Sequence, residues 1–228
     1  MRCSVCDSSQ FYHSNVLWPA LIQTWQLKAD EVAYINRQQG TKCAKCRNSL
    51  RSLALARAIC RSHNFEGTLQ QFCVDRTDFK VLEVNTAGGL TATLQSLKHH
   101  RLVEYPTFDM QNLNLPSDTY DLVVHSDTLE HIPDPVQGLK ECLRVLKPGG
   151  VCAFTVPIVI DRLTKDCKDS PPSYHGNSGK IEQDMLVHTE FGADAWKTVL
   201  LAGFDHCQIV AYEYPAALAL WARKANAT

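Results

Sequence analysis

The sequence lacks any long apolar run and any hydrophobic leader. No stretch of about 18 or more apolar residues occurs among the 228 residues, so the sequence contains no candidate for a transmembrane helix. The first residues, Met1 to Cys6, do not have the apolar core of a secretory signal peptide. We therefore expect a cytoplasmic protein that does not insert into a membrane.

An excess of charge of one sign is also missing. The 23 Lys and Arg residues nearly balance the 24 Asp and Glu residues, which leaves a net charge of −1. Such a chain has no general positive potential to attract nucleic acid or an anionic membrane. Residues 37–61 are a local exception, with seven Lys or Arg and no acid. We interpret these cations as solvated residues around a metal site and along a helix, and a nucleic-acid-binding patch is the alternative.

The chain does have ten cysteines, and their arrangement is uneven. Four of them form two Cys-x-x-Cys pairs, and the other six are single. Secreted disulfide scaffolds are short chains that cannot build a sufficient core, whereas this chain has 45% hydrophobic residues over an ordinary domain length. We therefore expect reduced thiols and a metal site.

The two pairs, Cys3 with Cys6 and Cys43 with Cys46, predict a zinc site. Each pair puts two thiolates on one tight turn, and two such turns complete a tetrahedral shell of four sulfur ligands. A closed shell has no open position for water or substrate, so the expected role of Zn²⁺ is structural. The alternative is a redox dithiol, but a redox Cys-x-x-Cys motif usually stands alone beside a βαβ unit.

The spacer between the pairs is long enough to carry structure of its own. It contains 36 residues, from Asp7 to Lys42, which exceeds the spacing of compact zinc ribbons. Two short helices are predicted in it, over 19–27 and 30–37, with Asp30 as the N-cap of the second.

An amphipathic helix is predicted after the second cysteine pair, over residues 48–63. Its arginines are predicted to face solvent: Arg51, Arg57 and Arg61. We expect a zinc-binding module that includes this linking helix over residues 1–62, and a second domain over residues 63–228.

The second domain has the pattern of an α/β sheet. Four apolar strands are predicted: 81–84, 101–105, 120–126 and 151–156. Glu83 lies in the first strand, and Glu104, at the end of the second strand, follows it by 21 positions. A carboxylate about 20 residues past a strand–turn–helix unit that binds a nucleotide is placed to hydrogen-bond the two hydroxyls of a ribose.

Several segments, taken in order, resemble the core of class I S-adenosylmethionine-dependent methyltransferases of the small-molecule type. They are Lys80–Asn85, Asp134–Pro135 and Leu146–Gly150, and the most specific local match is Asp127–Pro135, which resembles the exit of the fourth strand in that family. The resemblance implies a Rossmann-like sheet with helices on both faces, S-adenosylmethionine as cofactor and methyl transfer as the activity. A ligand cleft outside the carboxyl ends of parallel strands is expected in such a sheet.

The expected cofactor loop departs from the family pattern Glu-x-Gly-x-Gly-x-Gly. Asn85 and Ala87 stand at the first two glycine positions, and only Gly89 is retained. Asn tolerates a positive φ and Ala has the next smallest side chain, so we expect the turn to survive. The resemblance implies that Glu104 binds the ribose and Asp109 the adenine amine. The implied cofactor-binding residues are Glu83, Asn85, Ala87, Gly89, Glu104, Tyr105, Asp109, Met110 and His125.

The segment from Glu104 to Asp109 leads to one prediction about the fold and leaves one alternative for a site residue. Only four residues separate them, where the family usually has a helix and a third strand, so we predict that the third strand is shortened or missing. For Asp109, a carboxylate that caps a turn or helix is the alternative to adenine binding.

Residues 157–190 show no regular periodicity and are predicted to be a substrate-side loop or lid, followed by a helix over 190–202. Methyl transfer needs a base only if the acceptor must first lose a proton, and His is the side chain best suited to that near neutral pH. The candidate catalytic residues are His175 with its neighbour Tyr174, then His131 and His188. For each histidine, a hydrogen-bonded structural role is the alternative.

The sequence therefore predicts an S-adenosylmethionine-dependent methyltransferase that acts on a small molecule of the sugar or secondary-metabolite type. An RNA methyltransferase is one alternative, and a non-catalytic partner protein with a methyltransferase fold is another. Nucleic acid is not the expected partner, and a homodimer is considered. The acceptor atom, whether O, N or C, is left open, as is the question of whether the zinc module contacts the substrate, packs on the core or builds a dimer.

Overall fold

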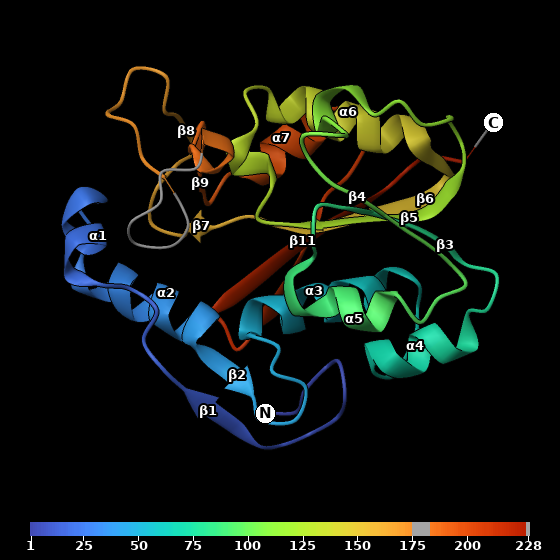
Figure 1. Cartoon of the computed structure of the whole chain (residues 1–228), viewed down its shortest axis with the longest axis horizontal. Coiled ribbons are helices and arrows are strands. Elements are labelled where there is room, and N and C mark those ends of the chain that lie inside the picture. The colour runs from blue at the N-terminus through green and yellow to red at the C-terminus, as the bar shows by residue number, and fades with distance from the viewer. Residues whose placement is uncertain (175–182, 227–228) are drawn as a thin grey trace.

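The computed structural model describes residues 1–174 and 183–226 (Figure 1). A six-stranded sheet with the order β10-β11-β6-β5-β3-β4 forms its centre. Five strands run in the same direction, and β11, between β10 and β6, runs antiparallel to both of its neighbours. The strands are β3 (Lys80–Val84), β4 (His99–Val103), β5 (Tyr120–Ser126), β6 (Leu146–Thr155), β10 (Gln208–Tyr212) and β11 (Ala217–Arg223).

The prediction that the third strand is missing is confirmed. Among the described residues, β4 is the edge of the sheet, and no strand pairs with its outer side. The chain instead passes through Glu104 into a short 3-10 helix, η2 (Met110–Asn112), before β5 begins. Too few residues lie between β4 and η2 to form a crossover helix and another parallel strand, which together need at least about ten residues.

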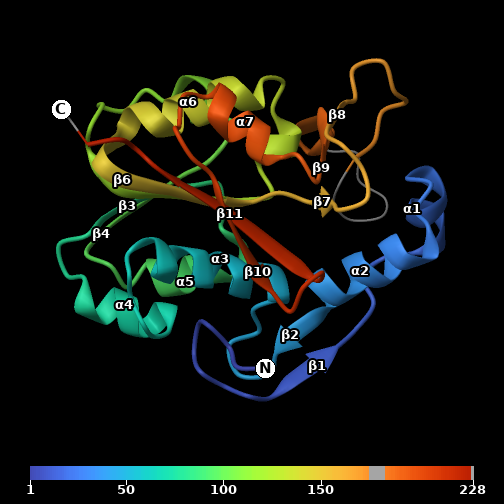
Figure 2. The same ribbon diagram turned by 180° about the vertical axis from the view of Figure 1, so that it is seen from behind.

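Helices cover both faces of this sheet (Figures 1 and 2). The helices α6 (Pro135–Val145) and α7 (Trp196–Leu201) lie on one face, and α3 (Leu50–Ser62), α4 (Leu69–Asp75) and α5 (Thr91–Leu94) lie on the other. Successive side chains of a strand point to opposite faces, so β5 contributes Leu122 and Val124 to the core under α3, and Val123 to the core under α6. The expected α/β architecture with two helical layers is therefore present.

Helix α3 begins after Ser49, whose side chain accepts a hydrogen bond from the backbone N–H of Ser52. The prediction that its three arginines face solvent is correct only for Arg61. Arg51 is paired with Asp127 at the exit of β5, and the Arg57 guanidinium lies 4.3 Å from the centre of the Tyr212 ring on β10. Helix α3 packs against the sheet and is also covered by α2 and α4, so Arg51 and Arg57 find partners at the end of β5 and on β10.

The amino-terminal region forms a two-stranded ribbon, β1 (Phe11–His13) with β2 (Thr41–Cys43), and two helices between these strands. The helices α1 (Pro19–Thr24) and α2 (Ala29–Gly40) extend away from the ribbon along one side of the molecule (Figure 1). The prediction that Asp30 caps α2 is wrong, because the N-cap residue is Lys28. Its backbone N–H donates to the Glu31 carboxylate at 2.8 Å, and this bond starts the helix.

The substrate-side segment has more regular structure than its sequence predicts. Three short strands, β7 (Ile158–Val159), β8 (Lys165–Asp166) and β9 (Thr189–Gly192), form a separate sheet with β9 in the middle. A helix starting at residue 190 was expected, but residues 189–192 pair as a strand and α7 begins only at Trp196. In the part of the chain that the structure describes, no helix is long and apolar enough to cross a membrane.

Candidate active site and metal centre

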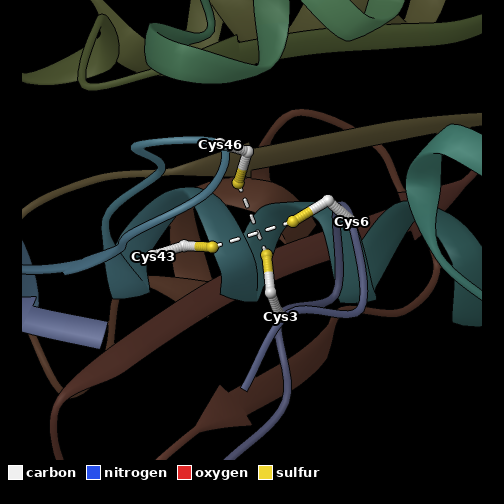
Figure 3. A group of neighbouring side chains, drawn as sticks. All are labelled: Cys3, Cys6, Cys43 and Cys46. Carbon is white, nitrogen blue, oxygen red and sulfur yellow. Dashed lines mark hydrogen bonds between the residues drawn. The ribbon is translucent and has the colours of Figure 1, made fainter. Parts of the chain in front are cut away.

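The four paired cysteines meet at one point (Figure 3). The Sγ atoms of Cys3 and Cys46 lie 3.5 Å apart, those of Cys6 and Cys43 lie 3.7 Å apart, and all four lie within 4.8 Å of one another. A tetrahedral zinc ion with Zn–S bonds of about 2.3 Å holds its sulfur ligands roughly 3.8 Å apart. The geometry therefore fits one Zn²⁺ bound by four thiolates.

This metal centre is part of the hydrophobic core and is not a separate lobe. Cys3, Cys6 and Cys43 belong to the same buried cluster as α3 and the sheet residues beneath it. The Tyr212 hydroxyl on β10 also donates to the backbone carbonyl of Arg2, next to the first cysteine. The cysteine cluster thus packs directly on the α/β domain.

Asn48 connects the metal centre to the predicted cofactor loop. Its side-chain N–H lies 3.4 Å from the Cys46 Sγ and points the amide toward that thiolate. The same side chain, only 2% exposed, lies against Gly89, where an added Cβ would come within 2.3 Å of the Asn48 Oδ1 atom. Close packing against Asn48 thus requires a glycine at position 89. The neighbouring Gly88 is needed for a different reason, because its φ is 58°.

Two predicted cofactor residues leave adjacent strands at the same edge of the sheet. The strands β3 and β4 are parallel and in register, with Val84 opposite Val103, so Asn85 and Glu104 emerge side by side. Asn85 has a φ of 53°, and its Oδ1 accepts from the backbone N–H of Tyr105 at 3.1 Å. Asn85 therefore adopts the left-handed conformation that the family pattern gives to glycine. The Glu104 side chain is exposed at this edge.

Glu83 is fully buried, and its carboxylate supports the loop from within. One oxygen accepts from the Ala87 backbone N–H at 2.6 Å and from the Thr91 hydroxyl at 2.5 Å. The other lies 2.6 Å from the His100 Nε2. Glu83 and Ala87 thus hold the turn together, and the neighbouring Tyr105 side chain is 57% exposed.

The remaining predicted cofactor residues lie in different surroundings. Asp109 accepts from the Gln111 backbone N–H at 2.8 Å and caps η2, which is the role given above as its alternative. Met110 is buried beneath this turn. His125 lies in the core and stacks on Phe154 with ring centres 4.8 Å apart, and burial lowers its pKa to about 3.

A cavity of about 900 Å³ lies between the amino-terminal helices and the substrate-side segment. Its inner end is formed at the exits of β5 and β6, where the Asp127 backbone N–H donates to the Thr155 carbonyl at 2.9 Å. Ligand cavities of open α/β sheets occupy this position, outside the carboxyl ends of the strands. Four polar side chains mark this end: Arg51, Asp127, Glu130 and His131.

These four side chains form two linked pairs. Arg51 is ion-paired with Asp127. Glu130 is buried in the short helix η3 (Leu129–His131), and its burial raises its pKa to about 8, against the opposing effect of the nearby Arg51 charge. The His131 Nδ1 is 3.1 Å from the Leu186 carbonyl, which can only accept, so the proton of the neutral ring belongs on Nδ1. The His131 Nε2 lies 3.6 Å from a Glu130 oxygen, and burial lowers the pKa of His131.

The predicted catalytic residues are only partly brought together. His131 lines the cavity, whereas Tyr174 and His188 are not among its lining residues. The His188 backbone N–H donates to the Glu130 carbonyl at 2.7 Å and fixes the substrate-side segment to η3. His175 lies outside the described residues.

The sequence reasoning missed Arg51, Asp127 and Glu130 as site residues. Asp127 and Glu130 could have been found, because both belong to Asp127–Pro135, the segment most similar to the methyltransferase family. Within that segment, only His131 was named as a candidate catalytic residue. Arg51 carried no such signal, since its position on α3 predicts solvent exposure as readily as burial.

Comparison with known proteins identifies the central part of the chain. A family model described as a methyltransferase domain matches residues 66–154. This segment is similar to a methyltransferase domain. It contains the β3 and β4 edge and the segment Asp127–His131, whereas the four cysteines and the helices α1 and α2 lie outside the match.

Curated relatives of this methyltransferase domain are similar over short segments. The chain is 42% identical over 50 residues to 2-methyl-6-phytyl-1,4-hydroquinone methyltransferase 2 of Oryza sativa subsp. japonica, which covers 22% of this chain and 14% of that protein. It is 34% identical over 92 residues to a demethylmenaquinone methyltransferase of Corynebacterium kroppenstedtii, covering 36% and 40%. The chain thus spans well under half the length of these relatives.

Among solved structures, a methyltransferase of Thermotoga maritima described as a possible histamine N-methyltransferase superposes with a TM-score of 0.44. The match has 14% sequence identity and covers 77% of this chain and 97% of the other.

Proposed function

We propose that the protein is an S-adenosylmethionine-dependent methyltransferase that methylates a small molecule, with a structural zinc ion bound by four cysteines. The observation that carries the proposal is the pairing of strand ends within the methyltransferase domain. Asn85 and Glu104 leave adjacent parallel strands at one edge, and the cavity lies at the exits of the next two strands of the same sheet.

The cofactor, when bound, supplies a methyl group on a sulfonium, whose S–C bond breaks as the acceptor–methyl bond forms and whose electron pair remains on sulfur. The Glu104 carboxylate is placed to accept hydrogen bonds from a ribose, because it is exposed at the strand edge. The Asn85–Gly88 turn, which has positive φ at both of these residues, lets the backbone approach a ligand closely. Asp109 is proposed to hold the adenine amine while it caps η2.

The acceptor is proposed to bind in the cavity with its reacting atom at the inner end. If the acceptor loses a proton there, we propose that the His131 imidazole, which lines the cavity beside Glu130, receives it. The remaining acceleration comes from holding the acceptor in line and excluding water. His175, Tyr174 and His188 remain candidates of the predicted lid. Relatives whose names specify hydroquinone and demethylmenaquinone methylation support a small-molecule acceptor. A cytoplasmic location and a homodimer remain proposals.

Calorimetric titration with S-adenosylhomocysteine tests the proposal. We expect binding by the zinc-loaded protein and an affinity about tenfold or more lower in Glu104→Ala, because a charged hydrogen-bond acceptor is removed. Glu66→Ala, which removes another exposed glutamate, is the matched control and should bind as the parent does.

Absence of any binding by the parent protein would contradict the proposal and favour a non-catalytic protein with a methyltransferase fold. Binding of RNA with a steep salt dependence would favour the RNA methyltransferase alternative, because phosphate contacts release counterions.

A further inference from the structure

We propose that α1 and α2, the spacer between the two zinc-binding cysteine pairs, form the acceptor-recognition wall of the cavity, and that the acceptor is a flat aromatic molecule with one polar end. This inference rests on the proposed function for the transfer itself. The recognition wall is here defined as residues 16–39, which contribute one side of the cavity.

The cavity is lined by rings and aliphatic side chains on both sides. The recognition wall provides Trp18, Leu21 and Trp25, and the opposite side provides Pro157, Ile158 and Phe191. Against such surfaces the hydroxyl groups of a sugar would lose water without gaining partners, at a cost in free energy for each group. The two faces of an aromatic ring need only apolar contact, and an indole is a favourable neighbour for them.

Charged side chains of the cavity are mostly paired with one another. Arg162 donates from Nε and Nη2 to the two oxygens of Glu31, both at 2.8 Å, and from Nη1 to Glu190 at 3.1 Å. Arg51 is paired with Asp127. The lining residues Lys28 and Lys165 are exposed to solvent. These pairings leave little demand for a strongly charged ligand, and the polar end of the acceptor meets Glu130 and His131.

Polar bridges hold the recognition wall in place. The Trp25 indole N–H donates to the Ser173 Oγ at 2.5 Å, in the substrate-side segment. Glu31 on α2 is only 6% exposed, so its pair with Arg162 is buried and directional. Within the wall, the Asn36 Oδ1 accepts from the backbone N–H groups of Val16 and Leu17 at 2.8 and 3.0 Å, which fixes the approach to Trp18. The bonds of Trp25 and Glu31 therefore tie the wall to the substrate-side segment across the cavity.

The size of the cavity agrees with this occupant. Its volume of about 900 Å³ is within the range of roughly 300–1,000 Å³ that small-molecule sites have. Arg51, Asp127, Glu130 and His131 lie together at the end beside β5 and β6, and the aromatic rings of the lining include both tryptophans of the recognition wall. An amphipathic ring compound would place its reactive group at the inner end and its ring between α1 and Phe191.

The test uses the full zinc-loaded chain with S-adenosylhomocysteine present and 2-naphthol as a flat aromatic probe, with D-glucose as the sugar comparison. Binding is measured by saturation-transfer NMR and by calorimetry. We expect 2-naphthol to bind and D-glucose not to bind. Trp25→Ala should weaken 2-naphthol roughly tenfold through loss of the ring contact, while Trp25→Phe, which keeps a ring, should stay within about threefold. Trp196→Ala, a tryptophan outside the cavity lining, should leave the probe affinity unchanged.

Zinc content and S-adenosylhomocysteine affinity are measured on every variant and should not change. If Trp25→Ala loses zinc or S-adenosylhomocysteine affinity, Leu21→Gln is used in its place. This substitution puts an amide on the recognition wall and should lower the affinity for 2-naphthol. Unchanged probe affinity in the folded variant, or preference for D-glucose, would overturn the proposal. Failure of the parent to bind S-adenosylhomocysteine would instead contradict the proposed function, and the 2-naphthol comparison would still test the wall.

Discussion

At the scale of single residues, the environment decides the chemistry of groups that the sequence leaves equivalent. Glu83, Glu104 and Glu130 are three glutamates of one domain. Glu83 is buried and bonded within the loop, Glu104 is exposed at the sheet edge, and Glu130 is buried beside His131 with a pKa raised to about 8. Of the three, Glu104 has the exposed side chain, and burial gives Glu130 its raised pKa.

The raised pKa of Glu130 makes the stability of the fold depend on pH. In the unfolded chain this carboxyl titrates near 4.5, and in the folded protein near 8, so between these values the folded state binds more protons. The contribution of Glu130 to the free energy of unfolding is therefore fully present below about pH 4.5. It is lost as the pH rises toward 8. Replacing Glu130 by Gln should reduce the fall in unfolding free energy between pH 5 and pH 8 by about 1 kcal/mol or more.

Urea denaturation of the parent and Glu130→Gln proteins at about pH 5, 6.5 and 8 measures this difference. Asp75→Asn, a substitution at an exposed acid on α4, serves as the control and should follow the parent curve. Parallel curves for the parent and Glu130→Gln would show that Glu130 is ionised in the folded protein.

At the scale of elements, the zinc-binding turn and the cofactor loop share a contact through Asn48 and Gly89. A metal-bound Cys46 would hold the Asn48 amide, and the amide in turn leaves no space for a Cβ at position 89. The retained glycine of the family pattern therefore makes room for Asn48, which contacts the cysteine cluster. Asn48 and Gly89, which are 41 positions apart, meet here. Neither the Cys-x-x-Cys spacing nor the glycine pattern of the loop predicts this contact.

A double-mutant cycle tests the contact between these two elements. Gly89→Ala should destabilise the protein by about 1–3 kcal/mol through overpacking against Asn48. Combining it with Asn48→Ala should recover part of that loss, because the atom at 2.3 Å from the new Cβ is gone. Urea unfolding of the four proteins gives the coupling energy, and a purely additive result would mean that the loop has moved away from Asn48.

At the scale of the whole molecule, the cysteine cluster, α3 and the sheet form one hydrophobic core. Binding of Zn²⁺ to folded but not to unfolded ligands adds its free energy to the stability of everything packed on the site. The zinc centre is therefore expected to support the methyltransferase domain as well as its own turns.

Loss of one zinc ligand should consequently lower the melting temperature of the whole chain. Cys43→Ser should lose zinc and melt at least about 5 °C lower. Cys167→Ser, which changes a partly exposed cysteine outside the cluster, should keep both zinc and stability. Calorimetric melting with metal analysis measures both properties, and an unchanged melting temperature in a zinc-free Cys43→Ser protein would show that the module is independent of the core.

The sequence alone determined those features that depend on local spacing. Two Cys-x-x-Cys pairs predicted the cysteine cluster, short apolar runs predicted the strands of the sheet, and the short distance from Glu104 to Asp109 predicted that the third strand is shortened or missing. Each of these follows from residues that lie close together in the chain, where periodicity and turn geometry are sufficient.

Tertiary structure decided what depends on distant segments meeting. It paired Arg51 with Asp127, paired residues 189–192 as a strand, and brought α1 and α2 opposite the substrate-side segment to form the cavity. No local pattern shows whether a helical arginine has an acid 76 positions away, because burial and ion pairing are properties of the packed molecule. The neighbouring strands that end before Asn85 and Glu104 could thus be predicted from the sequence, and the cavity could not.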